Sequence, residues 1–202
     1  MATSYKAAIP SLKKFEGGLV FIKTENQWTN RGVQYTTYVA LGKQLGLLLP
    51  LSLERFKVMP VRDWEKFIKY YWDKATFQNA IVNEYAALMM FQSYWGSGNT
   101  GIAKMQAALN KAYGLNLATD GIVGIKTITA INSNSGSANT MWVALFDYYM
   151  ALANDYPAKY GAFKQGWANR LNWIKPKAKG SDIAIIGLII GATGIYLYYR
   201  GI

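Results

Sequence analysis

Apolar residues recur with the 3.6-residue period of an α-helix through most of the chain. The clearest stripe runs through residues 63–73, where Trp64, Phe67 and Ile68 fall on one helical face. A strand-like alternation appears only near residues 19–37, which predicts a small hairpin there. The pattern therefore predicts a mainly helical protein, with helices at residues 63–73, 79–94, 105–113, 126–131 and 141–153.

Two polar stretches rich in glycine and serine, at residues 96–101 and 132–139, interrupt this periodicity. We expect the first of them to separate two helical halves, residues 1–95 and 96–174. The basic segment at residues 175–182 is typical of a linker. The chain is thus predicted to hold one enzyme-sized body in two halves, followed by an appendage.

The appendage is apolar throughout. As a helix, the uncharged run at residues 183–199 would measure about 26 Å, against a bilayer hydrocarbon core of roughly 30 Å. A buried core helix is the alternative, but the basic segment before the run and the tyrosines and Arg200 near its end favour a membrane span. We therefore predict a single transmembrane helix at residues 183–200, in the internal membrane of a virion or in a bacterial envelope.

Composition narrows the classes of function. The chain is 51% hydrophobic and 15% aromatic, which argues against disorder. It has neither cysteine nor histidine, so thiolate and imidazole ligands are excluded, and we expect neither a metal nor a cofactor. The formal charge of +11 favours an anionic partner, which leaves nucleic acid, a membrane surface or a cell-wall polymer. Nucleic acid is the least favoured, because no basic run is interleaved with aromatic residues.

Without histidine, any hydrolysis must rest on carboxylates. Glu16 ends an apolar helical segment beside Phe15, and Gly17 and Gly18 follow at once. These glycines would stop the helix and let a ligand approach the backbone. A carboxyl at such a corner suits a glycosidic general acid, whereas a surface glutamate near a helix end is the alternative. Glu25, in a polar loop further along, is either the second carboxylate or a solvated loop acid.

These residues carry a resemblance to a known family. Phe15-Glu16-Gly17-Gly18, followed by Glu25 and by Thr29-Asn30-Arg31-Gly32-Val33, resembles the opening of the glycoside hydrolase 108 family of phage-type N-acetylmuramidases. Glutamate stands at position 25 where the family has aspartate, and the loop after it is one residue shorter and lacks the family's paired glycines.

The resemblance extends to about residue 174, and its motifs occur in the family's order. Asp120-Gly121 also forms a turn dipeptide, for which a purely structural role is the simpler interpretation. The later motifs that resemble the family's second helical region, its peptidoglycan-binding half and its closing segment are Tyr71-Trp72-Asp73, Met105-Gln106 with Leu109, Asp120-Gly121 with Gly124 and Thr127, and Gly166-Trp167-Ala168-Asn169-Arg170.

The resemblance implies a lysozyme-like helical fold and hydrolysis of the β-1,4 bond between N-acetylmuramic acid and N-acetylglucosamine. It places Glu16 at the catalytic glutamate and Glu25 at the loop aspartate. Flat aromatic faces stack on sugar rings, which adds aromatic candidates. The predicted substrate-binding residues are Gly17, Gly18, Trp28, Thr29 and Tyr35.

Bacterial peptidoglycan is therefore the predicted partner, together with a lipid membrane and other virion proteins. A phage enzyme of entry or lysis would use such an activity. The alternative is a structural or wall-docking membrane protein of a virion that keeps the muramidase fold with reduced or no activity. The altered loop between Glu25 and Thr29 is the feature that supports this alternative.

Overall fold

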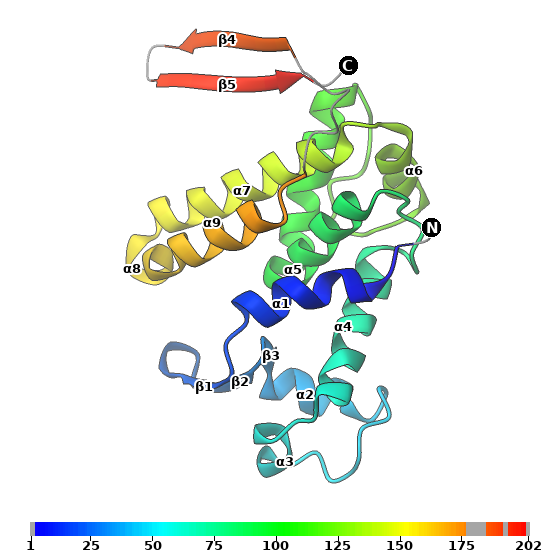
Figure 1. Ribbon diagram of the computed structural model, residues 1–202, viewed down its shortest axis with the longest axis vertical. Coiled ribbons are helices and arrows are strands. Elements are labelled where there is room, and N and C mark those ends of the chain that lie inside the picture. Colours follow the sequence, from blue (N-terminus) through cyan, green and yellow to red (C-terminus); the bar gives the residue numbers. More distant parts are fainter. Residues whose placement is uncertain (1–2, 177–184, 192–193, 201–202) are drawn as a thin grey trace.

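The computed structural model describes residues 3–176, 185–191 and 194–200. Helices dominate the body, as the hydrophobic pattern predicts. A small sheet, formed by residues 19–34, follows the first helix along the chain (Figure 1). The elements are, in chain order, η1 (Tyr5–Ala8), α1 (Ile9–Phe15), β1 (Leu19–Ile22), η2 (Lys23–Glu25), β2 (Gln27–Asn30), β3 (Val33–Gln34), α2 (Tyr35–Gly42), α3 (Leu53–Lys57), α4 (Val61–Ala75), α5 (Glu84–Tyr113), α6 (Ile125–Ser133), α7 (Ser137–Asp155), α8 (Pro157–Tyr160), η3 (Gly161–Phe163), α9 (Lys164–Trp173), β4 (Ile185–Gly191) and β5 (Gly194–Arg200).

The hairpin predicted near residues 19–37 is confirmed. Strands β1, β2 and β3 form an antiparallel sheet in that order, with Val20 opposite Thr29 and Thr29 opposite Gln34. Asn26 adopts a left-handed conformation at the β1–β2 turn, which a short polar side chain tolerates. Side chains alternate between the two faces of the sheet. Asn30 therefore lies on the opposite face from Thr29, where its side-chain amide donates hydrogen bonds to the Phe56 and Lys57 carbonyls at the end of α3.

The predicted interruption at residues 96–101 is confirmed as a break in the helix. Gly98 leaves the helical region, with φ 58° and ψ −142°, so α5 consists of two helical segments joined at a kink. Glycine adopts this conformation without steric cost, and the residues on either side of it remain helical, so the break is a single residue and not a loop. The second interruption is confirmed, because α6 ends at Ser133 and α7 begins at Ser137.

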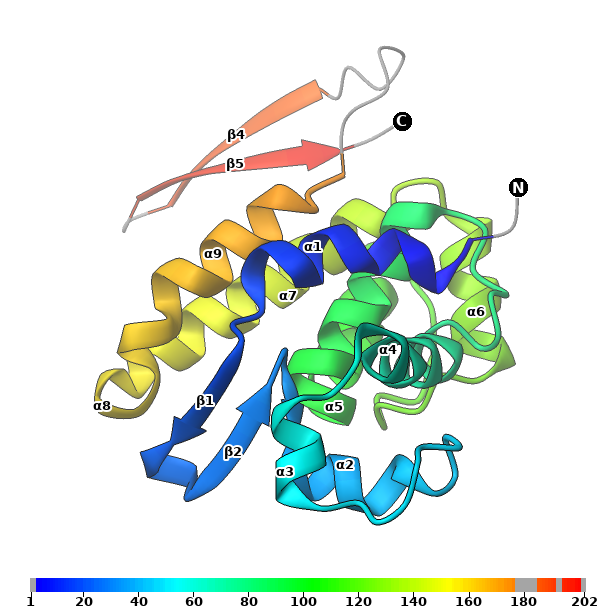
Figure 2. The same ribbon diagram turned by 60° about the horizontal axis from the view of Figure 1, so that its bottom comes forward.

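One hydrophobic cluster includes residues from both predicted halves, 1–95 and 96–174. Helix α5 runs through its centre and packs against α4 and, most extensively, α7 (Figure 2). The largest fully buried side chains include Trp64, Trp72 and Phe91. The two halves share one core, and their division into separate domains stays a prediction.

The transmembrane helix predicted for residues 183–200 is not found in the parts of this segment that the structure describes, residues 185–191 and 194–200. Strands β4 and β5 occupy this region and pair antiparallel, with Leu188 opposite Leu197. A uniformly apolar run has no periodicity that separates helix from strand, whereas its isoleucines and tyrosines favour strands and its glycines weaken a helix. Most of the predicted linker, residues 177–182, lies outside the described residues. Within the described part of the chain, no helix has the length and apolar character needed to cross a bilayer.

Candidate active site around Glu16

Glu16 sits where α1 ends. Its backbone N–H still donates to the Leu12 carbonyl at 2.8 Å, but its own φ and ψ, −83° and 128°, are extended. The chain therefore turns away at this residue. Gly17 and Gly18 follow, both exposed, and open space surrounds the position that a Cβ would occupy on either. The helix end predicted at this point is confirmed.

The Glu16 carboxylate is held through one of its two oxygens. Oε1 accepts a hydrogen bond from Trp95 Nε1 at 3.1 Å and lies 3.0 Å from a guanidinium nitrogen of Arg170. The two charged side chains are only 13% and 20% exposed, so water screens this pair less than a surface ion pair. Oε2 accepts no hydrogen bond from the residues that the structure describes. The carboxylate is thus oriented with one oxygen engaged and the other available.

Gly32 lies next to Glu16 Oε2, the oxygen that accepts no hydrogen bond from the described residues. Its φ is +80°, and a Cβ built on it would lie 2.7 Å from Glu16 Oε2 and 3.0 Å from Trp95 Nε1. Real Cβ atoms do not approach other atoms so closely, so a side chain here would displace the carboxylate. The turn between β2 and β3 therefore requires glycine both for its backbone conformation and for the space next to Glu16.

Aromatic residues support the two donors to Glu16. The Trp95 ring packs against Tyr71 and Phe91, with centroids 5.3 and 5.6 Å away. On the other side, the charges of Arg170 and Glu16 both act on Tyr149, whose pKa is raised chiefly by burial. The Tyr149 hydroxyl reaches so close to Gly96 that a Cβ there would collide with it.

Glu25 lies apart from this cluster of contacts. It ends η2 at the β1–β2 turn, is exposed, and accepts a hydrogen bond from Gln34 Nε2 at 3.0 Å. Gln34 is directly opposite Thr29 in the sheet, so Thr29 and Gln34 lie on the same face. Thr29 Oγ1 is buried and has no hydrogen-bond partner among the described residues. This face of the sheet therefore carries a buried hydroxyl, without a partner among the described residues, close to the residue that holds Glu25.

The two aromatic residues predicted to bind substrate take part in packing. Trp28 is half-buried, lies 5.3 Å from the Phe21 ring, and has Lys57 Nζ 4.6 Å from its ring centroid. Tyr35 packs 5.3 Å from Phe56 and donates a hydrogen bond to a main-chain carbonyl. Their roles in substrate binding stay predictions, as do those of Gly17, Gly18 and Thr29.

The sequence alone identifies neither Arg170 nor Trp95 as a site residue, although Arg170 belongs to the family-like closing motif at residues 166–170. Helix periodicity places neither residue next to Glu16, because they come from α5 and α9. The order of family-like motifs was the available signal, since the opening and closing motifs meet at this carboxylate.

In the second half, Gln106 organises the loop before α6. Its side chain is 1% exposed, donates to Asp120 Oδ1, the Ile122 carbonyl and Thr127 Oγ1, and accepts from Gly121 N at 2.8 Å. The backbone N–H of Ile122 donates to Asp120 and lowers the pKa of that carboxyl. These contacts give Asp120-Gly121 the structural role expected of a turn.

Comparison with known protein families addresses this second half. Residues 100–172 match a family model described as a predicted peptidoglycan domain. A search of curated proteins found no match. The family match supports a peptidoglycan-related protein, and the assignment to the glycoside hydrolase 108 family stays a prediction. The matched segment contains both Gln106 and Arg170, so the peptidoglycan-like region supplies one of the two groups that hold Glu16.

Proposed function

We propose that the protein is a peptidoglycan hydrolase that cleaves the β-1,4 bond between N-acetylmuramic acid and N-acetylglucosamine, with Glu16 as the general acid. The observation that carries the proposal is the capture of Glu16 Oε1 by Trp95 and Arg170, which leaves Oε2 beside Gly32. A largely buried carboxyl in a fixed orientation is what protonation of a glycosidic oxygen requires. The family match at residues 100–172 supports the substrate class.

The arrangement assigns the proton to one oxygen. Because Oε1 already accepts the Trp95 hydrogen bond and faces the Arg170 guanidinium, the acidic proton of a protonated Glu16 resides on Oε2. In the proposed step Oε2 gives this proton to the bridging oxygen while the bond from that oxygen to the sugar's anomeric carbon breaks. Water then adds to the anomeric carbon and releases one proton. Glu16 takes up one proton in turn, so that the acid is ready for the next cycle.

Glu25 is the proposed second carboxylate. A negative charge near the anomeric carbon would stabilise the developing positive charge or orient the water. The Gln34 amide donates to the Glu25 carboxylate and holds it at the edge of the sheet. The net charge of +11 adds a general attraction for an anionic wall.

A zymogram on purified peptidoglycan tests the proposal. We expect the full chain to clear the gel and Glu16→Gln to abolish clearing, because the amide keeps the shape but has no acidic proton to transfer. Glu54→Gln on α3 is the matched control, since it removes the same charge from an exposed glutamate. Mass spectrometry of the products should find N-acetylmuramic acid at the new reducing ends. Clearing by Glu16→Gln at the wild-type rate would remove Glu16 from the mechanism.

A wall-docking protein without activity is the second candidate. The separation of hydrogen-bond partners between Glu16 and Glu25 favours it, because a carboxylate pair acting on one bond must face the same sugar. Such a protein would pull down with insoluble peptidoglycan but would leave the gel opaque. The same preparation therefore separates the two candidates when sedimentation and clearing are measured side by side.

A further inference from the structure

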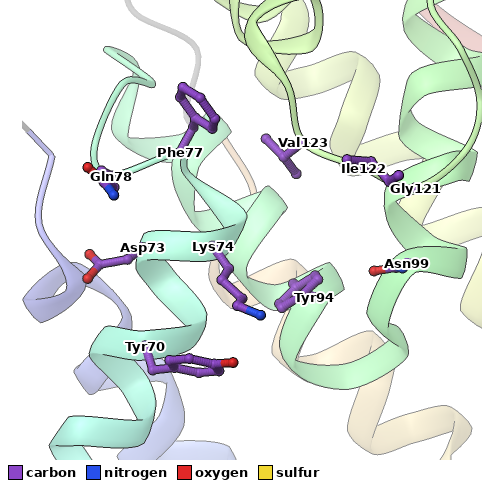
Figure 3. A pocket seen from close by; sticks show the side chains of 10 residues that line it. All are labelled: Tyr70, Asp73, Lys74, Phe77, Gln78, Tyr94, Asn99, Gly121, Ile122 and Val123. Atoms are coloured by element: carbon purple, nitrogen blue, oxygen red, sulfur yellow. The ribbon is translucent and has the colours of Figure 1, made fainter. Parts of the chain in front are cut away.

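A hollow that is separate from the Glu16 site lies where the N-terminal helices meet the peptidoglycan-like region. It has a volume of about 540 Å³ and lies between the C-terminal part of α4, the middle of α5 and the loop before α6 (Figure 3). Tyr70 and Lys74 line it from α4, Tyr94 and Asn99 from α5, and Ile122 from the loop. Neither Glu16 nor Glu25 lines it.

The loop wall belongs to the matched region and is fixed from inside the body. Gln106 binds the loop at Gly121 and Ile122. Gly121 has φ +75° and lies so close to the Asn99 carbonyl that any Cβ would collide with it. The loop is thereby held against α5, while the Ile122 side chain remains 64% exposed at the rim.

The opposite rim is a strained turn after α4. Phe77, Gln78 and Asn79 are consecutive non-glycine residues with φ of 51°, 55° and 68°, a conformation that costs roughly 1–2 kcal/mol per residue. Asn79 secures the turn, because it accepts a 2.6 Å hydrogen bond from Trp72 Nε1 and donates its backbone N–H to Thr76. The turn leaves Phe77 48% exposed (Figure 3). The turn therefore places an exposed aromatic side chain at the edge of the hollow.

Lys74 supplies positive charge to the hollow. Its Nζ lies 4.8 Å from the centroid of the Tyr70 ring, and the Tyr70 hydroxyl raises the pKa of Lys74, so the amine stays charged at neutral pH. The neighbouring Asp73 carboxylate is paired with Lys69. The lining of the hollow therefore combines the Lys74 cation, the Asp73 carboxylate that Lys69 neutralises, apolar rims and the side-chain amides of Gln78 and Asn99.

A row of aromatic rings connects the hollow to the candidate active site. Tyr94 lies 5.8 Å from Tyr71, and Tyr71 lies 5.3 Å from Trp95, which donates to Glu16. Three neighbouring aromatic side chains thus lie between Glu16 and the hollow.

We propose that this hollow binds the peptide stem of peptidoglycan, with a stem carboxylate at Lys74 and alanine methyl groups between Phe77 and Ile122. This inference rests on the proposed function for its substrate. A peptide matches the lining better than a sugar does, because it brings carboxylates for the ammonium, methyl groups for the apolar rims and amides for Gln78 and Asn99. The hollow, which α4, α5 and the loop of the matched region form together, then recognises the branch while Glu16 acts on the glycan.

The test compares two probes on the full chain carrying Glu16→Gln, which prevents turnover: a disaccharide tetrapeptide released from peptidoglycan and the same disaccharide without its peptide. Titration calorimetry should show tighter binding of the peptide-bearing probe. Lys74→Met should weaken that binding about fivefold, as expected for a partly exposed ion pair, and should reduce its dependence on salt. The affinity for the peptide-free probe should not change. Lys111→Met, which removes an exposed lysine from the end of α5, is the matched control.

A second variant tests the apolar rim. Phe77→Ser should weaken only the peptide-bearing probe and leave its salt dependence intact. Three outcomes would overturn the stem site. They are equal affinities for the two probes, no binding of the peptide-bearing probe, and wild-type affinity for that probe in Lys74→Met. Clearing of peptidoglycan by the chain without Glu16→Gln is scored separately. If binding depends on Lys74 but the chain does not clear peptidoglycan, only the hydrolase proposal is wrong. If the chain clears peptidoglycan but Lys74→Met does not change binding of the peptide-bearing probe, only the stem site is wrong.

Discussion

Arg170 of α9 and Glu16 at the end of α1 form an ion pair with 3.0 Å between guanidinium nitrogen and carboxylate oxygen. The pair joins the beginning of the chain to the end of the matched peptidoglycan-like region. Because Trp95 donates to the same oxygen, the carboxylate has one orientation relative to the sheet. The proposed catalytic group is thus positioned by contacts distant in sequence.

Arg170→Met should reduce the free energy of unfolding by roughly 2 kcal/mol, because it leaves a largely buried carboxylate without its charged partner. Clearing of peptidoglycan should fall strongly, since only Trp95 would then orient Glu16. In the double variant with Glu16→Gln the loss of stability should be smaller than the sum of the single losses. Urea unfolding of the four proteins measures this coupling, and strictly additive losses would show that the pair contributes nothing.

Gly32→Ala should abolish activity and lower stability. Two effects combine, since φ of +80° disfavours alanine by about 1 kcal/mol and the new Cβ would push on Glu16 Oε2. Gly46→Ala separates them, because Gly46 has φ +64° and open space around its Cβ position. We expect the control to lose similar backbone stability yet keep full activity. Normal turnover in Gly32→Ala would mean that Oε2 does not take part.

Glu25→Gln should lower kcat and change KM little, because the charge of Glu25 is proposed to stabilise the transition state and to contribute little to ground-state binding. A partial loss, about tenfold to a hundredfold, is expected, because Glu16 still supplies the proton. Gln34→Ala should reproduce part of the effect, since it removes the donor that holds Glu25. Steady-state release of reducing sugars measures both parameters. An unchanged kcat in Glu25→Gln would return this residue to a solvated loop acid.

The hydrogen bond to Asp120 should make the body sensitive to acid. The Ile122 N–H lowers the pKa of Asp120 below its ordinary value of 3.8, so the unfolded chain takes up this proton at a higher pH than the folded chain. The stabilisation is therefore present above about pH 4 to 5 and is lost as the pH falls through the folded pKa. Asp120→Asn should show a smaller decrease in its urea midpoint between pH 5 and pH 2. Parallel curves for the two proteins would contradict this.

The sequence by itself determined the features that depend on local order. Helical periodicity located α4, α6 and α7, alternation located the hairpin, and a glycine pair after Phe15 located the end of α1. Each of these patterns depends only on residues that are close in the sequence, so it predicts local structure without knowledge of the fold.

Tertiary structure decided the rest. No local signal places Arg170 or Trp95 against Glu16, because their contacts span the length of the body. The polar stretch near Gly98 is a kink between two helical segments of α5, and side chains of both segments pack into the same core. The apolar run after residue 183 has no periodicity, so hydrophobicity alone suggested a helix where strand pairing between β4 and β5 occurs.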